Sequence, residues 1–202
     1  MKPFFAACTA LAVIAAPASA APVVGKPAPN FKLADVNGKA VSLSDFRGKT
    51  VVLEWNNPEC PFVKKHYGSG NMQKTQAAAA KDGVVWLSIN SSAPGKQGHK
   101  NGADAKAHLA QSGARPAAYL LDPNGVVGKA YDAKTTPHMY IVNKAGTLVY
   151  AGGIDDKPTP NPADVNGARN HVLAALSELK AGKAVSVTTS RPYGCAVKYK
   201  DS

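Results

Sequence analysis

Cysteine is scarce in this 202-residue sequence, which holds only Cys8, Cys60 and Cys195. Cys60 lies in the stretch LEWNNPECPFVKKHYG, residues 53–68, and the position three residues after it is Val63. The absence of a second cysteine there excludes a local Cys-x-x-Cys redox cycle. It also leaves this motif one strong ligand short of a metal site. Cys60 is therefore a lone reactive thiol, half of a long-range pair, or a small buried residue.

Acidic residues are also few, because 13 Asp and Glu stand against 24 Lys and Arg, for a formal net charge of +11. In a nucleic-acid-binding surface, lysines usually cluster beside aromatic or arginine residues. Here they are scattered along the chain. Long apolar runs are missing too, since nothing after residue 20 approaches the roughly 20 apolar residues of a membrane helix. The sequence thus predicts neither nucleic-acid binding nor an integral membrane protein.

Residues 1–20 combine a basic start at Lys2, the apolar run FFAACTALAVIAA and the small residues ASA. This is the pattern of a secretory signal peptide. We therefore expect cleavage after Ala20, loss of Cys8 with the signal, and export as a periplasmic or secreted protein. Residues 21–182 are expected to form one domain, and residues 183–202 a C-terminal extension that carries Cys195.

The rest of the sequence alternates between strand and helix patterns. Residues 27–49 predict a hairpin around Asn37-Gly38, and the apolar runs 50–55 and 83–90 predict buried strands. Pro61 suits the first position of a helix, which extends toward residue 80 with interruptions at Gly68 and Gly70. A helix is expected over 102–112, a strand over 117–122 and a hairpin over 139–154.

A final helix is predicted over residues 162–182 because six apolar residues there fall near one helical face: Val165, Ala168, Val172, Ala175, Leu176 and Leu179. The segment after it is expected to begin as a strand and then become irregular. This order of elements predicts an α/β fold, with a mixed central sheet flanked by helices, an N-terminal hairpin and a C-terminal tail.

A cysteine at the strand-to-helix junction after VVLEW, the motif TTPHMYIVN before an antiparallel hairpin, and a terminal helix together resemble the thioredoxin fold. The leading hairpin and GKTVVLEW are most similar to the peroxiredoxin-like branch, related to alkyl hydroperoxide reductase and thiol-specific antioxidant proteins. The resemblance covers about Pro22 to Gly182. It implies an antioxidant or oxidoreductase activity that needs no bound cofactor or metal.

The position of Cys60 favours a reactive thiolate. At the start of a helix, free backbone amides and the helix dipole stabilise the thiolate form. Lys64 and Lys65 follow one turn later and add positive charge, whereas Glu59 opposes it if its side chain points inward. The alternative is a buried inert cysteine, which the charged flanking residues disfavour.

Two further features follow from the resemblance. Peroxiredoxins carry a threonine or serine three residues before the peroxidatic cysteine and an arginine nearby, but here Asn57 stands at that position, and only Asn56, Asn57 or Arg115 could assist a peroxide. In the thioredoxin fold a cis-proline faces the reactive cysteine and leaves the preceding backbone free for a thiol substrate. Thr136-Pro137 matches that position, so we expect this bond to be cis and close to Cys60.

Cys195 is the second cysteine of the expected mature chain, and in an exported protein two cysteines suggest pairing. A stable Cys60–Cys195 bond would fasten the extension to the domain. An exposed, strained bond would instead be a redox couple in which Cys195 resolves an oxidised Cys60. Both readings stay open at this point, as does an unpaired Cys195.

We therefore predict an exported thiol oxidoreductase of the peroxiredoxin-like type, with a site formed by Cys60, Cys195, Thr136 and Pro137. Its substrate would be a peroxide or a protein thiol or disulfide, and its reductant an unidentified thiol. One alternative is a copper carrier that uses Cys60 with His66 or His138. Another is a binding protein on a thioredoxin scaffold without redox activity.

Overall fold

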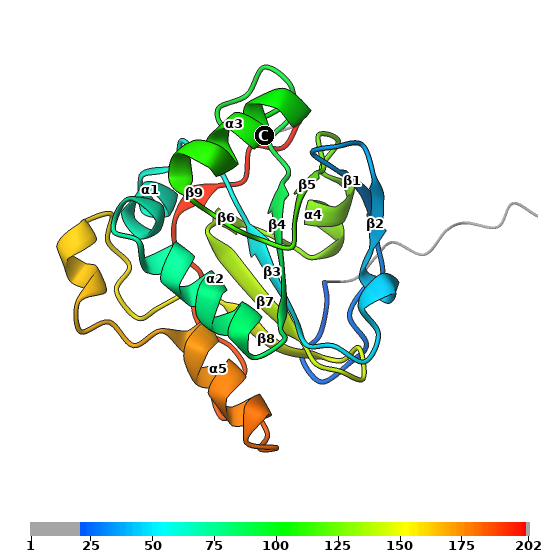
Figure 1. Ribbon diagram of the computed structural model, residues 1–202, viewed down its shortest axis with the longest axis vertical. Coiled ribbons are helices and arrows are strands. Elements are labelled where there is room, and N and C mark those ends of the chain that lie inside the picture. The colour runs from blue at the N-terminus through cyan, green and yellow to red at the C-terminus, as the bar shows by residue number, and fades with distance from the viewer. Residues whose placement is uncertain (1–20, 201–202) are drawn as a thin grey trace, which may run out of the picture.

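The apolar run before Cys60 forms β3 (Val51–Trp55), which is buried along its whole length. In the computed structural model, which describes residues 21–200, β3 lies in a seven-stranded sheet of order β2-β1-β5-β4-β3-β7-β8 (Figure 1). It pairs parallel with β4 (Val85–Asn90) and antiparallel with β7 (His138–Val142). The expected signal peptide, with Cys8, lies outside the described residues.

The other strands extend this sheet on both sides. The predicted hairpin is confirmed as β1 (Lys32–Asp35) and β2 (Ala40–Ser42), and β1 pairs antiparallel with β5 (Ala118–Leu121). The second predicted hairpin is confirmed as β7 with β8 (Leu148–Gly152). β4 and β5 are parallel, so the sheet is mixed, as predicted.

Helices cover the two faces of the sheet. They are α1 (Pro61–Gly68), α2 (Asn71–Lys81), α3 (Gly102–Ser112), α4 (Val126–Ala130) and α5 (His171–Lys180), together with the short 3₁₀ helices η1 (Leu43–Phe46) and η2 (Pro162–Val165). Gly70, with φ of 74°, separates α1 from α2, as the glycines there predicted. No helix in the described part of the chain is long and apolar enough to cross a membrane.

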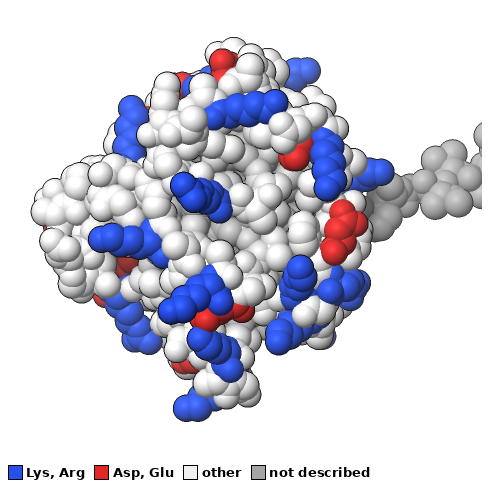
Figure 2. Space-filling view, in the orientation of Figure 1, with Lys and Arg blue, Asp and Glu red and all other residues white. Residues whose placement is uncertain are grey.

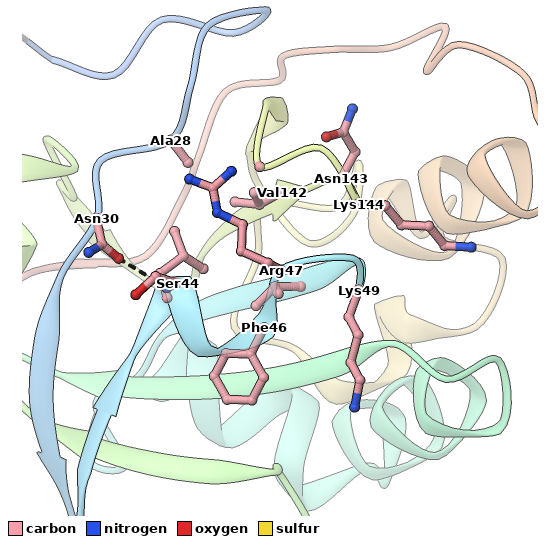
Figure 3. Close-up of a pocket in the computed structure, with 12 residues that line it drawn as sticks. Ala28, Asn30, Ser44, Phe46, Arg47, Lys49, Val142, Asn143 and Lys144 are labelled. Carbon is pink, nitrogen blue, oxygen red and sulfur yellow. Dashed lines mark hydrogen bonds between the residues drawn. The ribbon is translucent and has the colours of Figure 1, made fainter.

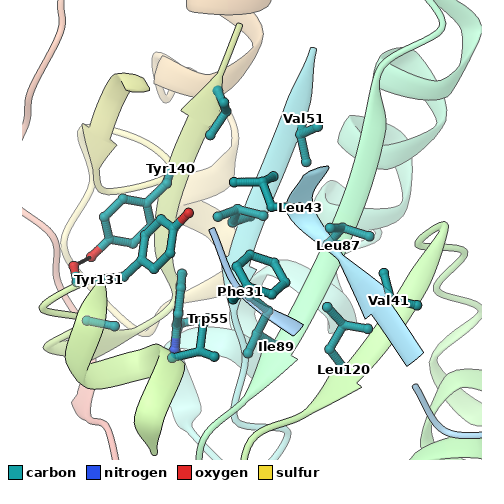
Figure 4. Close-up of a cluster of buried hydrophobic side chains, with 14 of the residues drawn as sticks. Phe31, Val41, Leu43, Val51, Trp55, Leu87, Ile89, Leu120, Tyr131 and Tyr140 are labelled. Atoms are coloured by element: carbon teal, nitrogen blue, oxygen red, sulfur yellow. Dashed lines mark hydrogen bonds between the residues drawn. The ribbon is translucent and has the colours of Figure 1, made fainter. Parts of the chain in front are cut away.

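Alternate residues of β3 point into two separate cores, as the period of a strand requires. Val51, Leu53 and Trp55 face the core under α4, where Trp55 packs against the rings of Tyr131 and Tyr140 (Figure 4). Val52 faces the other core, formed with α1, α2 and α5. The sheet is thus buried on both faces, and its edge at the carboxyl end of β3 is where Cys60 follows.

Two predictions about the C-terminal region are wrong. The helix starts at His171 rather than at residue 162, because Gly167 has φ of 78° and Asn170 caps the helix by accepting from the backbone of Leu173. The tail, residues 183–200, makes only an isolated bridge at Thr189 and then forms β9 (Cys195–Ala196) where irregular chain was expected. β9 is a strand because β6 (Thr135–Thr136) gives it a partner, which a local pattern cannot reveal.

Candidate functional site

Cys60 is held at the junction between β3 and α1. It is the N-cap residue of α1, with extended φ and ψ of −67° and 126°, and Pro61 takes the first helical position as predicted. Its carbonyl accepts the first helical hydrogen bond, from Lys64 N at 2.9 Å. The Cys60 sulfur therefore lies at the amino terminus of a helix, beside backbone N–H groups that no helical carbonyl occupies.

Thr136 and Pro137 approach the same sulfur from the neighbouring strand. The Thr136-Pro137 bond is cis, which confirms the prediction. His138 of β7 is paired with Trp55 of β3, so Pro137 comes just beyond the end of the sheet at which Cys60 follows. The Cys60 Sγ donates to the Thr136 carbonyl oxygen at 3.1 Å.

The tail completes the site by bringing Cys195 to Cys60 across 135 residues of sequence. β9 runs antiparallel to β6, with Cys195 paired to Thr136. The Cys195 N–H points at the Cys60 Sγ, with the two atoms 3.4 Å apart, and the two side chains are free thiols joined by a hydrogen bond. All four residues predicted from the sequence thus lie together.

The surroundings shift the pKa values of the two thiols in opposite directions. Burial alone raises the pKa of Cys60, but hydrogen bonds from the Cys195 thiol, the Val63 and Cys195 amides and the Thr136 side chain outweigh it and lower that pKa. Burial, followed by the hydrogen bond and charge of Cys60, raises the pKa of Cys195 to about 11. Of the two thiols, that of Cys60 is therefore the more acidic.

Two expectations about the surroundings of Cys60 are wrong. The charged flanks do not keep it at the surface: its exposed fraction is 0%, because the tail covers it and Val63, Met139 and Tyr193 belong to the same core. Lys65 does not face the sulfur either, since its ammonium donates to the Lys157 carbonyl oxygen at 2.7 Å. Backbone and thiol hydrogen bonds, rather than lysine charge, favour the thiolate.

The groups that could assist a peroxide are already engaged or distant. The Asn57 side chain accepts from the Glu59 amide at 2.9 Å, and the Asn56 side chain donates to Glu54 at 2.9 Å. Arg115 precedes β5 and its backbone N–H donates to Gln76, beside the amino-terminal half of β4 rather than near Cys60. A peroxide at Cys60 would find little polarising charge.

The histidines considered as copper ligands have other partners. His66 Nε2 lies 3.1 Å from the Tyr193 hydroxyl, and His138 Nδ1 lies 3.1 Å from the Tyr140 hydroxyl. Burial lowers the pKa of each of these histidines to about 4. Within residues 21–200, no group of three or more His, Cys, Asp or Glu side chains is placed to hold a metal ion.

Sequence reasoning missed a buried carboxylate behind the site. Glu54 lies in the run VVLEW and is fully buried, yet both of its oxygens are satisfied. One accepts from Asn56 and Tyr67, and the other from Trp86 and Ser88, all at 2.7–2.9 Å. The signal was a single charge inside an otherwise apolar strand, which needs buried hydrogen-bond donors.

The cavities distinguish the two ends of the sheet. A cavity of about 590 Å³ lies beside the tail and is lined by Phe62, Thr135, Pro192 and Gly194, among others. A much smaller one, of about 30 Å³, lies among Arg47, Lys49 and Lys144 (Figure 3). Val51 and Val142 line this second cavity, so it is at the opposite end of β3 from Cys60 and plays no part in the thiol site.

Surface charge does not single out a second site. In Figure 2 the lysine and arginine side chains are spread over the visible face, with acidic groups between some of them. This agrees with the scattered positions of the 24 basic residues in the sequence.

Comparison with known proteins relates this arrangement to a family. Residues 24–151 match the AhpC/TSA family. The thiol-disulfide oxidoreductase ResA of Bacillus subtilis (strain 168) is 27% identical over 132 residues, which are 62% of this chain and 64% of ResA. The match thus spans just under two thirds of that relative's length.

Two solved structures are similar over almost their whole length. An uncharacterized conserved protein from Geobacillus kaustophilus has 30% identity and a TM-score of 0.77, covering 89% of this chain and 94% of its own. The protein SMc02350 from Sinorhizobium meliloti 1021 has 26% identity and a TM-score of 0.78, covering 91% and 98%. The similarity therefore extends beyond residues 24–151.

Proposed function

The chain belongs to the AhpC/TSA family and has the thioredoxin-like fold, and from these premises we propose that it is a thiol-disulfide oxidoreductase whose working pair is Cys60 and Cys195. The observation that carries the proposal is the contact between two free thiols of opposite acidity that are 135 residues apart. The name of ResA, a thiol-disulfide oxidoreductase, supports the same class of reaction.

In the reduced protein the Cys60 thiolate attacks one sulfur of a substrate disulfide. A bond forms between Cys60 Sγ and that sulfur, and the other substrate sulfur leaves as a thiolate that takes up a proton. Cys195 then loses its proton and attacks Cys60 Sγ, so that a Cys60–Cys195 disulfide forms and the second substrate thiol is released. The substrate gains two electrons from the enzyme and two protons, of which one comes from Cys195 and the other from the solvent.

Disulfide exchange is favoured over peroxide reduction because of what surrounds the sulfur. The side chains of Asn56 and Asn57 are already hydrogen-bonded to neighbouring groups, and Arg115 lies away from Cys60. A disulfide needs only a thiolate and a second thiol in line, and Cys60 and Cys195 provide both.

The reaction is tested by mass spectrometry of the reduced protein after exposure to glutathione disulfide or to hydrogen peroxide. With glutathione disulfide the mass of the wild type should fall by two hydrogens, because the Cys60–Cys195 disulfide forms. Cys195→Ser should stop as a Cys60–glutathione adduct. Cys60→Ser should form no intramolecular disulfide. Faster oxidation by hydrogen peroxide than by glutathione disulfide, seen as a gain of one oxygen or a loss of two hydrogens, would favour a peroxidase. A Cys60–Cys195 bond that forms but that no thiol can reduce would indicate a structural disulfide.

The site of action follows from the expected signal peptide. We infer export, because residues 1–20 combine a basic start, an apolar run and small residues, as a secretory signal peptide does. Intact-mass measurement of the protein recovered outside the cytoplasm should give a chain that starts at Ala21, and a mass that retains residues 1–20 would count against it.

A further inference from the structure

A cluster of three buried charged or polar side chains lies beside the thiol pair without taking part in its chemistry. The side chains of Lys65 and His66 are 0% exposed and that of Asp155 is 1% exposed. Asp155 Oδ2 lies 3.7 Å from Lys65 Nζ and 3.9 Å from His66 Nε2, and it accepts no hydrogen bond. Burial of such groups costs several kcal/mol per ion unless they are paired, so the cluster calls for a function.

The tail supplies the group that completes this cluster. The hydroxyl of Tyr193 donates to Asp155 Oδ1 and lies 3.1 Å from His66 Nε2. Its ring packs edge-on against Phe62, with centroids 5.9 Å apart, and Lys65 Nζ lies 5.5 Å from its centroid. Tyr193 is thereby held by α1 on one side and by the segment after β8 on the other.

The two residues after Tyr193 lead directly to the reactive sulfur. Gly194 has φ of 139°, and a Cβ there would lie 2.0 Å from the Thr136 carbonyl oxygen. The tail backbone is therefore too close to β6 for any side chain at this position. Cys195 follows, paired with Thr136 and with its N–H on Cys60 Sγ. Because α1 carries both Cys60 at its start and His66 within it, the position of Tyr193 sets the position of Cys195 relative to Cys60.

We propose that Tyr193 is a positioning residue, whose hydroxyl, held by the buried Asp155–His66 pair, keeps Cys195 in contact with Cys60. The proposal rests on the thiol-disulfide function above and deepens it. It gives the buried cluster a role: the cluster fixes the tail so that Cys195 is present at a high effective concentration. A fixed Cys195 favours the Cys60–Cys195 disulfide over mixed disulfides with an external thiol.

The tail has other attachments, so loss of one hydroxyl should loosen it without unfolding it. Ser190 Oγ accepts from Gly153 N at 3.0 Å and is 2.7 Å from the Tyr150 hydroxyl. After Cys195 in the tail, the Tyr199 hydroxyl donates to the Ala133 carbonyl oxygen at 2.8 Å. These contacts make Tyr193→Phe a mild change and offer Tyr199→Phe as a matched control, since that variant removes a tail hydroxyl remote from the cluster.

The test measures the equilibrium constant for forming the Cys60–Cys195 disulfide in buffers of oxidised and reduced glutathione. The wild type, Tyr193→Phe, Asp155→Asn and Tyr199→Phe are compared.

We expect Tyr193→Phe to lower this constant by about tenfold, so that its disulfide is easier to reduce; the change is equivalent to about 30 mV for a two-electron couple. Asp155→Asn should shift it in the same direction, and Tyr193→Phe with Asp155→Asn should add less than the sum of the two. Tyr199→Phe should leave it near the wild-type value.

An unchanged constant in Tyr193→Phe, in a wild type that does form the disulfide, would overturn this proposal and leave the proposed function intact. An equal fall in Tyr199→Phe would also overturn it, because the effect would then belong to general tail stability. A wild type that forms no Cys60–Cys195 disulfide would count against the proposed function and this inference together. Should Tyr193→Phe not fold, Asp155→Asn carries the same prediction through the other partner of the hydrogen bond.

Discussion

At the scale of single residues, Cys60 and Cys195 differ because hydrogen bonds lower the pKa of Cys60 against its burial, whereas burial, the hydrogen bond and the charge of Cys60 raise the pKa of Cys195. The Cys195 N–H donates to the Cys60 sulfur at 3.4 Å, and the thiol of Cys195 itself helps to lower the pKa of Cys60. The same contact raises the pKa of Cys195. Each cysteine therefore needs the other to take up its role, and replacing one changes the chemistry of the other.

This reciprocity predicts the effect of Cys195→Ala on the titration of Cys60. Removal of the thiol donor should raise the pKa of Cys60. Cys195→Ser keeps a hydroxyl donor at the same place and should raise it less. The titration is followed through the ultraviolet absorbance of the thiolate in the reduced proteins. Equal midpoints in wild type and Cys195→Ala would show that the helix terminus alone sets the acidity of Cys60.

At the scale of elements, the site depends on β9 being a strand of only two residues. Its pairing with β6 puts Cys195 beside Thr136, and Gly194 permits this because no side chain fits between the two strands. The tail thus lies in the position where, in the thioredoxin fold, the backbone before the cis-proline is free for an extended substrate. If the substrate is an extended peptide, it must compete with β9 or reach the sulfur beside it.

Gly194→Ala should therefore separate the tail from the site. Its Cβ would lie 2.0 Å from the Thr136 carbonyl oxygen, and the φ of 139° is strained for any L-residue. We expect the Cys60–Cys195 disulfide to form poorly and Cys60 to be alkylated faster, because the cover over it is displaced. Alkylation of the reduced protein, followed by mass, measures this.

Gly113→Ala is the matched control for that substitution. Gly113 also has a positive φ, of 65°, but nothing lies within 4 Å of its Cβ position. Its replacement should cost about 1–2 kcal/mol of stability and leave the alkylation rate of Cys60 unchanged. Faster alkylation in both variants would mean that general loss of stability, rather than displacement of β9, exposes the sulfur.

Elements with local sequence signals could be predicted, whereas contacts between distant residues could not. β3, the helix start at Pro61 and the cis-proline loop have local signals: an apolar run, a proline at the first helical position and a recognisable motif. The last helix was predicted too long because its apolar spacing continues through Gly167 into η2, where the backbone has already turned. The direction of the Lys65 side chain depends on Asp155 and Lys157, which lie about 90 residues away in sequence. The position of Tyr193 depends on Asp155, 38 residues away, and no local pattern contains such contacts.

At the scale of the whole molecule, the fold keeps two histidines neutral inside its cores. Burial lowers the pKa of His66 and of His138 to about 4. His66 lies with α1 and the tail, whereas His138 begins β7 on the other side of the cis-proline. Both ends of the thiol site thus include a group that resists protonation as long as the chain is folded.

These histidines predict that acid destabilises the protein between about pH 6.5 and pH 4. In the unfolded chain a histidine binds a proton near its ordinary pKa of about 6.5, whereas in the folded chain His66 and His138 do so only near 4. Within this window the unfolded state holds more protons, so the free energy of unfolding decreases as the pH falls, by at most about 3 kcal/mol for each histidine. The pKa of Asp122, raised by burial, acts in the opposite direction near the lower limit.

Urea unfolding of the reduced protein at a series of pH values across this window measures the effect. In the middle of the window the slope of unfolding free energy against pH should reach that of the two protons of His66 and His138, and His108 adds to it because burial lowers its pKa as well. The slope should flatten below about pH 4. His138→Gln, which cannot titrate there, should reduce the slope by about one proton even if it lowers stability at neutral pH. A slope that is zero in the wild type, or the same in His138→Gln, would mean that these imidazoles are already protonated in the folded protein, and that the neutral environment inferred around the site is wrong.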